Sequence, residues 1–305
     1  KFIQQFYSNI DYYIPDRYNE GYGVSTKGAN YAAETGVKLV IVLDCGIKAV
    51  DEIAYAKEKG IDFIICDHHV PDDVLPDAVA ILNAKREDNT YPYEHLSGCG
   101  VGFKFMQAFA ISNGIEFHHL IPLLDLVAVS IASDIVPIMG ENRILAYHGL
   151  KQLNTNASVG MKAIIDVCGL AEKEITVSDI VFKIGPRINA SGRIQNGKEA
   201  VELLVEKDLA TALNKANQIN QYNETRKDLD KSMTEEANRI VAGLEGLADR
   251  RSIVLFNEDW HKGVIGIVAS RLTEIFYRPA VVLTRTDDLA TGSARSVSGF
   301  DVYKA

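Results

Sequence analysis

The chain has 305 residues, of which 47% are hydrophobic and 24% are charged. This ordinary globular composition excludes a disordered, collagen-like or coiled-coil protein, and the length is enough for about two domains. No apolar run reaches the roughly 18 residues of a membrane-spanning helix, and the first residues lack a signal-peptide pattern. The 32 basic and 41 acidic residues give a net charge of −9, which argues against a general nucleic-acid coat.

The four cysteines are far apart and form no C-x-x-C pair: Cys45, Cys66, Cys99 and Cys168. They fit reduced thiols better than a disulfide framework or a zinc site, so a soluble, cytoplasmic protein without membrane contact is expected. The sequence begins at Lys1 without an initiator methionine, and we expect a fragment of a longer protein.

The first third alternates apolar strand-like runs with helical patterns, which predicts a parallel sheet with crossover helices. The strands are expected at 38–43, 61–66 and 78–82, and a helix at 49–59. After a polar turn, a glycine-rich and then helical segment covers 98–111.

The middle of the chain reads as helical. Residues 120–132 are almost wholly apolar and predict a buried helix. Residues 143–196 are mostly helical, with turns at 154–158 and 185–186, and 198–242 is predicted to be one long polar helix that bridges two domains.

A second α/β unit is expected to begin with a strand at 252–256, a helix at 263–276 and a strand at 280–283. The predicted fold is therefore α/β, with a parallel-sheet domain joined by a long helix to a smaller α/β domain. The expected boundaries are 1–196, 197–245 and 246–305.

Two carboxylates follow the two clearest strands: Asp44 and Asp67, the latter before His68 and His69. The carboxyl ends of parallel strands meet at one edge, so these side chains are expected to share a crevice. Carboxylates with imidazoles suit Mn²⁺ or Mg²⁺ better than structural zinc. Taken alone, the motif has a simpler explanation: Asp67 caps the turn that follows it, and both histidines are solvated.

Two further features bear on this site. Asp134 ends an apolar helix, either as a helix-end hydrogen-bonding group or as a ligand. The glycine-rich segment 97–102 precedes a helix, where backbone N–H groups bind an anion or the glycines form a tight packing turn.

Together these residues resemble the DHH phosphoesterase superfamily, and within it the RecJ-type single-strand-specific exonucleases. The ordered motifs cover nearly the whole chain: PDRYNEGYG (15–23), LDCG around Asp44, Asp67-His68-His69, SGCGVGFK (97–104), ASDIVPIMGENR (132–143), GPRINASGR (185–193), WHKGVIGIVASRL (260–272) and GSARS (292–296).

The resemblance implies a two-metal site that hydrolyses phosphodiesters from a free 5′ end. It implies that Asp44 bridges the metals, and that His68 and Asp134 complete the shell of the second. His69 would contact the scissile phosphate, and Asp67 would orient the pair. By the same resemblance, 1–196 is the catalytic domain, 197–245 the connecting helix and 246–305 the start of the substrate-binding domain.

One departure stands out, because the family's first motif, Asp-x-Asp-Gly, is absent. We expect the first metal to be lost or weakened, and the chain alone to be weakly active or inactive.

Charge is distributed unevenly. Residues 44–88 hold eleven acidic and five basic side chains, whereas 183–198 hold four basic and none acidic. Arginine and hydroxyl groups suit phosphate, and the candidates for nucleic-acid contact are Arg187, Asn189, Ser191, Arg193, His261, Ser293 and Arg295. Alternatively, the arginines of 185–193 pair with acids at the domain junction.

The aromatic and histidine motifs allow simpler interpretations. Trp260 and His261 either stack on bases or pack in the core, and Tyr277 is expected in the core. His118-His119 reads as a solvated helix start. Phe103, Phe105 and Phe109 read as core.

The leading hypothesis is a 5′→3′ single-strand-specific DNA exonuclease of DNA repair and recombination, working with single-stranded DNA, single-strand-binding protein and a helicase. A phosphodiesterase of the same superfamily for short oligonucleotides or cyclic dinucleotides is the second hypothesis. A non-catalytic replication scaffold is the third.

Overall fold

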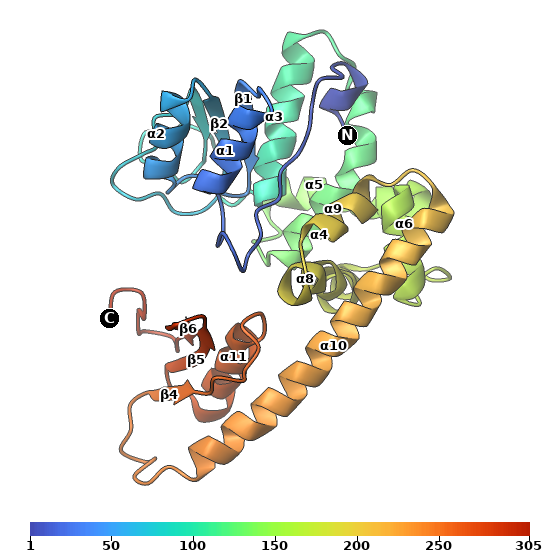
Figure 1. The fold of residues 1–305 in the computed structure, drawn as a ribbon. Helices are drawn as coiled ribbons and strands as arrows, with labels where there is room; N and C mark the ends of the chain where they lie inside the picture. The colour runs from blue at the N-terminus through green and yellow to red at the C-terminus, as the bar shows by residue number, and fades with distance from the viewer. The chain divides into compact units, whose positions relative to one another are not determined.

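The structure, a computed structural model, describes residues 1–305 and divides them into two units (Figure 1). Unit 1 contains residues 1–189 and 196–218, and unit 2 contains residues 190–195 and 219–305. The long helix α10 (Leu209–Ala242) contributes to both, because the boundary falls within it. None of the helices is both long and apolar enough to cross a membrane.

Unit 1 is built on the predicted parallel sheet, in the order β1 (Leu39–Leu43), β2 (Asp62–Cys66) and β3 (Ala80–Leu82). Leu43 pairs with Cys66, and Cys66 with Leu82, so the three strands end at one edge. Helices α1 (Thr26–Glu34) and α2 (Val50–Glu58) share one core cluster with the sheet. Side chains of the other face pack with two later helices, α3 (Gly98–Ser112) and α4 (Leu124–Ser133). A sheet covered on both faces explains the apolar runs that predicted its strands.

Helix α3 (Gly98–Ser112) begins inside the glycine-rich segment 97–102, which the sequence had placed before the helix. Ser97 is its N-cap and accepts a hydrogen bond from the Gly100 N–H (3.1 Å), so the glycines lie inside the first turns of the helix. Helix α4 (Leu124–Ser133) is buried as predicted, but two 3₁₀ turns (Phe117–His119 and Ile121–Leu123) replace its expected first residues.

The helical region follows with α5 (Gly140–Asn156), α6 (Val159–Val167), α7 (Val177–Asp179), a π-helix (Ile180–Ile184) and α8 (Gly185–Ile194). The predicted turn at 185–186 is wrong, because the backbone stays helical there and proline is tolerated in a first helical turn. Gly185 instead allows close packing, since a Cβ atom on it would lie 2.6 Å from the Ser133 hydroxyl of α4.

The single helix predicted over 198–242 is also wrong. The structure has α9 (Lys198–Val205) and α10, separated where Glu206 adopts an extended backbone conformation. The side chain of Glu206 then accepts hydrogen bonds from the backbone N–H groups of Lys207 and Asp208. Such local bonds compete with helix continuation.

Unit 2 combines the end of α10 with β4 (Ile253–Phe256), α11 (Ile265–Phe276), β5 (Ala280–Thr286) and β6 (Leu289–Arg295). Strand β4 is parallel to β5, and β6 is antiparallel to it. The sequence did not predict β6, which follows a two-residue turn where Asp287 has a positive φ of 53°. Polar contacts join α10 to the α/β part: the Arg271 guanidinium donates to both carboxylate oxygens of Asp230 (2.8 and 2.7 Å).

Candidate functional site

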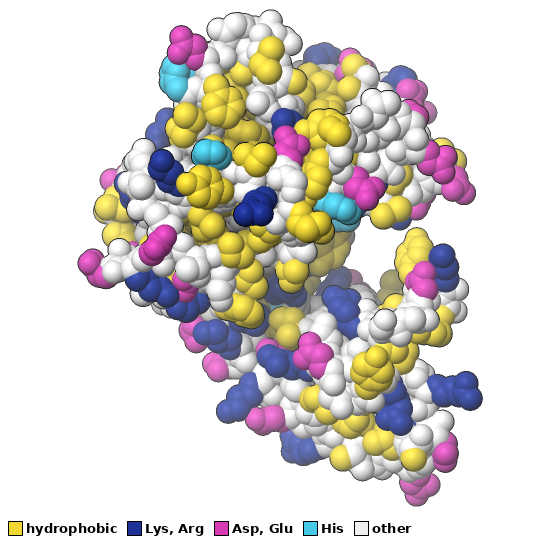
Figure 2. Space-filling view, turned by 180° about the vertical axis from the view of Figure 1, so that it is seen from behind, with side chains coloured by type: hydrophobic (Ala, Val, Ile, Leu, Met, Phe, Trp, Pro, Cys, Tyr) yellow, Lys and Arg dark blue, Asp and Glu magenta, His cyan; other side chains and the backbone are white.

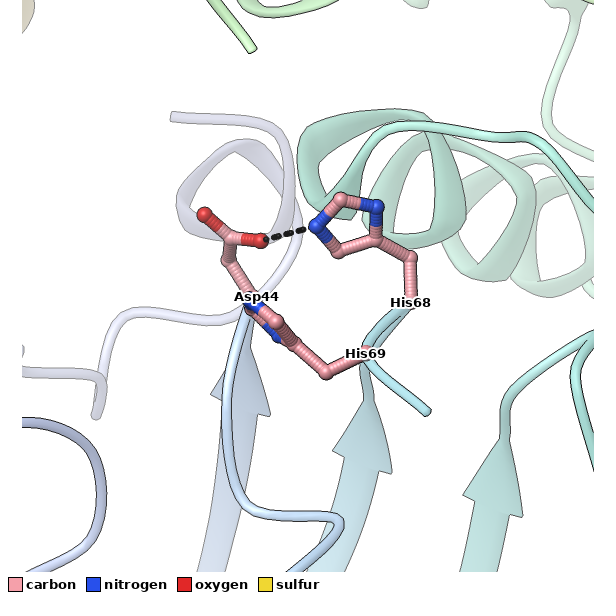
Figure 3. A group of neighbouring side chains, drawn as sticks. All are labelled: Asp44, His68 and His69. Carbon is pink, nitrogen blue, oxygen red and sulfur yellow. Dashed lines mark ion pairs between the residues drawn. The ribbon is translucent and has the colours of Figure 1, made fainter. Parts of the chain in front are cut away.

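The ends of β1 and β2 bring Asp44, His68 and His69 together, with their ligand atoms within 4.8 Å of one another. Figure 3 shows the three side chains rising from neighbouring strand ends. Asp44 directly follows Leu43, the last residue of β1. Leu43 pairs with Cys66, the last residue of β2, and Asp67 and the two histidines follow Cys66. The parallel pairing predicted from sequence therefore creates the cluster.

His68 is at the centre of this cluster. Its Nε2 atom lies 3.2 Å from Asp44 Oδ1 and 3.3 Å from Asp134 Oδ2. Its Nδ1 atom is 3.1 Å from the carbonyl oxygen of Leu96, the arrangement that leaves Nε2 as the ligand atom of an imidazole. The hydrogen bond to Asp44 raises the pKa of His68, burial opposes this, and the charge of Asp134 adds to it.

Asp67 has a different position. Its side chain is only 1% exposed, and Oδ1 lies 2.7 Å from His69 Nδ1. Oδ1 also accepts from the His68 N–H (2.7 Å), and Oδ2 accepts from the Ile47 N–H (3.0 Å). Burial pushes the pKa of Asp67 upward, but these hydrogen bonds outweigh it and the pKa is lowered. Asp67 therefore stays ionised and fixes the two histidines.

Asp44 occupies a strained and crowded position. It has a φ of +64°, a left-handed conformation that is uncommon outside glycine, although Asp and Asn adopt it more readily than other residues. Its carboxylate lies against the first residue of α3, because a Cβ atom on Gly98 would be 1.9 Å from Asp44 Oδ1. Only glycine fits at position 98 while Asp44 holds this orientation.

Asp134 reaches the cluster from helix α4. It is the C-cap of that helix, and its N–H donates to the Ser130 carbonyl (2.9 Å). The next residue, Ile135, has a φ of +56°, a left-handed conformation that usually ends helices at glycine. The chain therefore turns sharply at the point where the Asp134 side chain meets His68.

The donor set fits a divalent cation. Two carboxylates and an imidazole nitrogen converge without any cysteine ligand, which favours Mn²⁺ or Mg²⁺ over structural zinc. The side chains of Asp44 and Asp134 are 59% and 43% exposed, so their oxygens are accessible to both an ion and a substrate. A cation there would relieve the repulsion between the two carboxylates.

A second cluster forms in unit 2 around the start of α11. The N-cap residue, Val264, offers no side-chain hydrogen bond to the first turn. A Cβ atom on Gly266 would lie 3.0 Å from Ser293 Oγ and 3.4 Å from Arg295 Nη2. The Arg295 guanidinium also donates to Ser293 Oγ (3.1 Å). Hydroxyl and guanidinium groups thus lie at a helix N-terminus, an arrangement suited to a phosphate.

Two more predicted residues join this second cluster. Arg193 donates to the Gly263 carbonyl (3.2 Å), and His261 Nδ1 accepts from the Gly263 N–H (3.1 Å). His261 is half-buried, and this burial lowers its pKa. Three motifs that are far apart in sequence, 185–193, 260–272 and 292–296, therefore contribute to one cluster of unit 2.

The remaining candidates of 185–193 lie elsewhere. Arg187 and Asn189 belong to unit 1, where Arg187 donates to the Lys183 carbonyl (2.9 Å). Ser191 has no exposed surface. The bonds described for Arg187 and Arg193 go to backbone carbonyls.

The aromatic predictions have mixed outcomes. Trp260 is 4% exposed, and its Nε1–H donates to Glu236 (2.7 Å), which makes it a core residue. Tyr277 is 73% exposed, so its predicted core position is wrong: it ends α11 in the left-handed conformation (φ 50°) and points away from the core. His118 and His119 belong to a 3₁₀ turn; His118 is exposed, as predicted, whereas His119 is half-buried against Phe6. Phe103 is buried, with Phe105 and Phe109 packed against the same core.

Sequence reasoning missed two elements of the first cluster. The Leu96 carbonyl that holds His68 is a backbone group, so no side-chain pattern indicates it. Gly98 carries a signal in the run of alternating glycines from 98 to 102, but its contact with Asp44 depends on tertiary packing.

Comparison with known proteins agrees with this architecture. The N-terminal domain of the DHH family matches residues 1–131, and the DHHA1 domain matches residues 249–305. The single-stranded-DNA-specific exonuclease RecJ of Bacillus subtilis (strain 168) is 40% identical over 99% of this chain, and the Haemophilus influenzae protein of the same name is 37% identical over 96%. The chain spans 38% and 53% of the lengths of these two relatives.

The fold is shared as well. A crystal structure of exonuclease RecJ bound to manganese superimposes with a TM-score of 0.82 and 28% sequence identity, covering 96% of this chain and 71% of that one. With both domains matched in order and relatives similar along nearly its whole length, the chain belongs to the DHH family and is a relative of its RecJ exonucleases.

Proposed function

We propose that this chain carries the catalytic machinery of a metal-dependent hydrolase, a single-strand-specific DNA exonuclease that works 5′→3′ in DNA repair and recombination. The observation that carries the proposal is the convergence of the Asp44 and Asp134 carboxylates on Nε2 of His68 at the end of a parallel sheet. The names of its relatives supply the substrate class, single-stranded DNA.

In this proposal, Asp44, His68 and Asp134 would hold Mn²⁺ or Mg²⁺, and Asp44 would be the ligand that two ions share. When bound, the ions supply Lewis acidity that activates water and neutralises charge on the scissile phosphate and its leaving oxygen. The chain itself contributes a fixed imidazole and carboxylates that are already oriented. This lowers the reorganisation needed when substrate arrives.

His69 would contact the scissile phosphate. Because Nδ1 of His69 lies 2.7 Å from Asp67, a proton on Nδ1 is donated to that carboxylate and Nε2 is the atom left for a phosphate oxygen. Asp67 therefore acts as a positioning residue in this scheme.

The second cluster would receive the phosphate at the 5′ end of the strand. Ser293 and Arg295 at the start of α11 provide the donors, with Arg193 and His261 beside them. Arg187 and Asn189 would contact the strand backbone from unit 1, and the buried Ser191 would support α8 from inside.

We assign residues 1–196 to catalysis, 197–245 to the connection and 246–305 to substrate binding. Single-stranded DNA is the proposed partner, with single-strand-binding protein and a helicase as protein partners in repair. A cytoplasmic location suits the four free cysteines.

The proposed function is tested by measuring from which end DNA is degraded and whether single strands are preferred to duplex. The chain, in excess and with Mn²⁺, is mixed with end-labelled single strands blocked at the 5′ or the 3′ end and with a blunt duplex. We expect degradation only of single strands with a free 5′ end, and none after EDTA treatment. Undiminished degradation of the 5′-blocked strand, or equal degradation of the duplex, would contradict the proposal.

A further inference from the structure

The third strand of the unit 1 sheet also ends at the edge that carries the metal cluster. Strand β3 is paired in parallel with β2 up to Leu82, opposite Cys66. Asn83 follows, and its side-chain amide donates to the His69 carbonyl (2.8 Å). The segment after β3 therefore starts in direct contact with the candidate metal centre, at the edge where open α/β sheets bind their ligands.

This segment encloses a cavity of about 440 Å³, which we call the loop pocket; its lining residues are Ala84–Arg86, Asn89 and Tyr91–His95. The volume falls within the usual range for small-molecule sites. The next residue along the chain, Leu96, holds His68 through its carbonyl. The loop pocket is thus tied to the metal cluster at both of its ends, through His69 and through His68.

Two tyrosines give the loop pocket rigid aromatic walls. The Tyr91 hydroxyl donates to Glu141 (2.6 Å), which also accepts from Lys104 (2.8 Å). The Tyr93 hydroxyl donates to the Pro137 carbonyl (3.0 Å). Tyr91 is held from outside the pocket by the first turn of α5, and Tyr93 by the segment just before that helix, so the aromatic surface that lines the cavity is preorganised.

Lys85 provides a positive charge in the loop pocket that suits a phosphate group. It lines the loop pocket, and its ammonium group has no ion pair or hydrogen bond in the structure, whereas the neighbouring Arg86 is paired with Asp88. An available cation beside aromatic rings suits a ligand that has both a phosphate and a base.

We propose that the loop pocket is a nucleotide subsite next to the metal centre, with Lys85 on the phosphate and Tyr91 and Tyr93 against the base. The ligand class is a nucleoside monophosphate, as a single unit of the strand beside the scissile bond or as the released product. This inference rests on the proposed nuclease function, but its binding step needs no metal.

The test measures binding of deoxythymidine monophosphate to the chain by equilibrium dialysis in EDTA, with deoxythymidine and inorganic phosphate as separate ligands. We expect saturable binding of the monophosphate at millimolar concentration. Lys85→Ala should weaken it about tenfold without affecting deoxythymidine, and Lys85→Arg should restore it. Tyr91→Leu should weaken both the nucleotide and the nucleoside about tenfold, whereas Tyr91→Phe keeps the ring and should bind nearly normally.

Matched controls are Lys151→Ala and Tyr147→Leu, exposed residues of α5 that do not line the loop pocket; neither should change binding. Absence of saturable binding, equal binding by wild type and both Lys85→Ala and Tyr91→Leu, or full competition by phosphate alone would overturn the inference. Binding with this variant pattern in a chain that hydrolyses no strand would instead count against the proposed function alone.

Discussion

The two units differ in charge and in the kind of ion that we propose for each. Unit 2 has thirteen acidic and thirteen basic residues, so the whole net charge of −9 lies in unit 1. Figure 2 shows Lys and Arg side chains spread over the lower part of the view, while apolar side chains and a few histidines mark the upper part. The overall charge therefore says little about where a polyanionic strand would bind.

The two candidate sites also use a helix N-terminus in opposite ways. In unit 1, Ser97 caps the start of α3, and the Asp44 carboxylate lies against the first residue of that helix. A negatively charged side chain of the protein itself therefore already faces this helix N-terminus. In unit 2, the start of α11 has no side-chain cap and lies beneath Ser293 and Arg295. The first arrangement gathers carboxylates for a cation, and the second leaves donors for an external anion.

The largest expected effect comes from removing the negative charge at the first site. Asp44→Asn keeps the shape of the side chain, and asparagine tolerates the positive φ of this position. We expect Mn²⁺ affinity, measured by calorimetry, to fall at least about 100-fold, with a comparable loss of strand hydrolysis.

Asp72→Asn is the control, because Asp72 is exposed and pairs only with Lys48. It removes the same charge from unit 1 away from the cluster. If both variants bind Mn²⁺ equally well, then the general acidity of unit 1, and not this ligand set, attracts the ion.

Gly98→Ala should change the same site through packing alone. The added Cβ would overlap the Asp44 carboxylate, so this side chain must turn away from His68. We expect Mn²⁺ affinity to fall about tenfold or more and the free energy of unfolding to fall by about 1–3 kcal/mol. Gly100→Ala, whose Cβ would come no closer than 3.3 Å to Ser97 Oγ, is the milder control; an equal loss in both variants would place the effect in α3 itself.

Much of the first site could be predicted from sequence, because it follows from strand order. Asp44 and Asp67 each come directly after a strand whose apolar run is clear, His68 follows Asp67, and parallel strands end together. Asp67 is a buried acceptor next to His69, and its orienting role stays a prediction. The contacts of Leu96 and Gly98 could not be predicted, because they depend on how α3 packs on the sheet.

The sequence indicated individual residues of the second site but did not indicate that they form one cluster. Arg193, His261 and Arg295 were each selected for their chemistry, but their meeting point at α11 depends on β6. That strand contains few strongly apolar residues, so its pattern resembled a loop. Tyr277 was misplaced for a related reason: its aromatic ring suggested the core, whereas the helix end determines where it points.

Arg295→Ala tests whether unit 2 binds the 5′-phosphate at the end of a DNA strand. We expect about a tenfold loss of preference for a 5′-phosphorylated over a 5′-hydroxyl single strand, since one charge-assisted contact is removed. Mn²⁺ affinity should stay unchanged. Arg285→Ala is matched in charge and lies in unit 2, but its guanidinium pairs with Glu258; the comparison fails if this variant loses the phosphate preference equally.

The smallest expected effect contrasts two left-handed residues, one in each unit. Tyr277 ends α11 with a φ of 50° and is 73% exposed, so Tyr277→Gly relieves backbone strain and loses little packing. We expect thermal unfolding to show a gain of about 1 kcal/mol, with Tyr277→Ala, which keeps the strain, showing none. Asp44→Gly relieves the same conformation in unit 1 but should abolish tight Mn²⁺ binding, because it removes the carboxylate that we propose as a ligand. If Tyr277→Gly also weakened binding of single strands, then Tyr277 would contact a base. Its left-handed backbone would then place a binding side chain, as the left-handed backbone of Asp44 places a carboxylate in the first cluster.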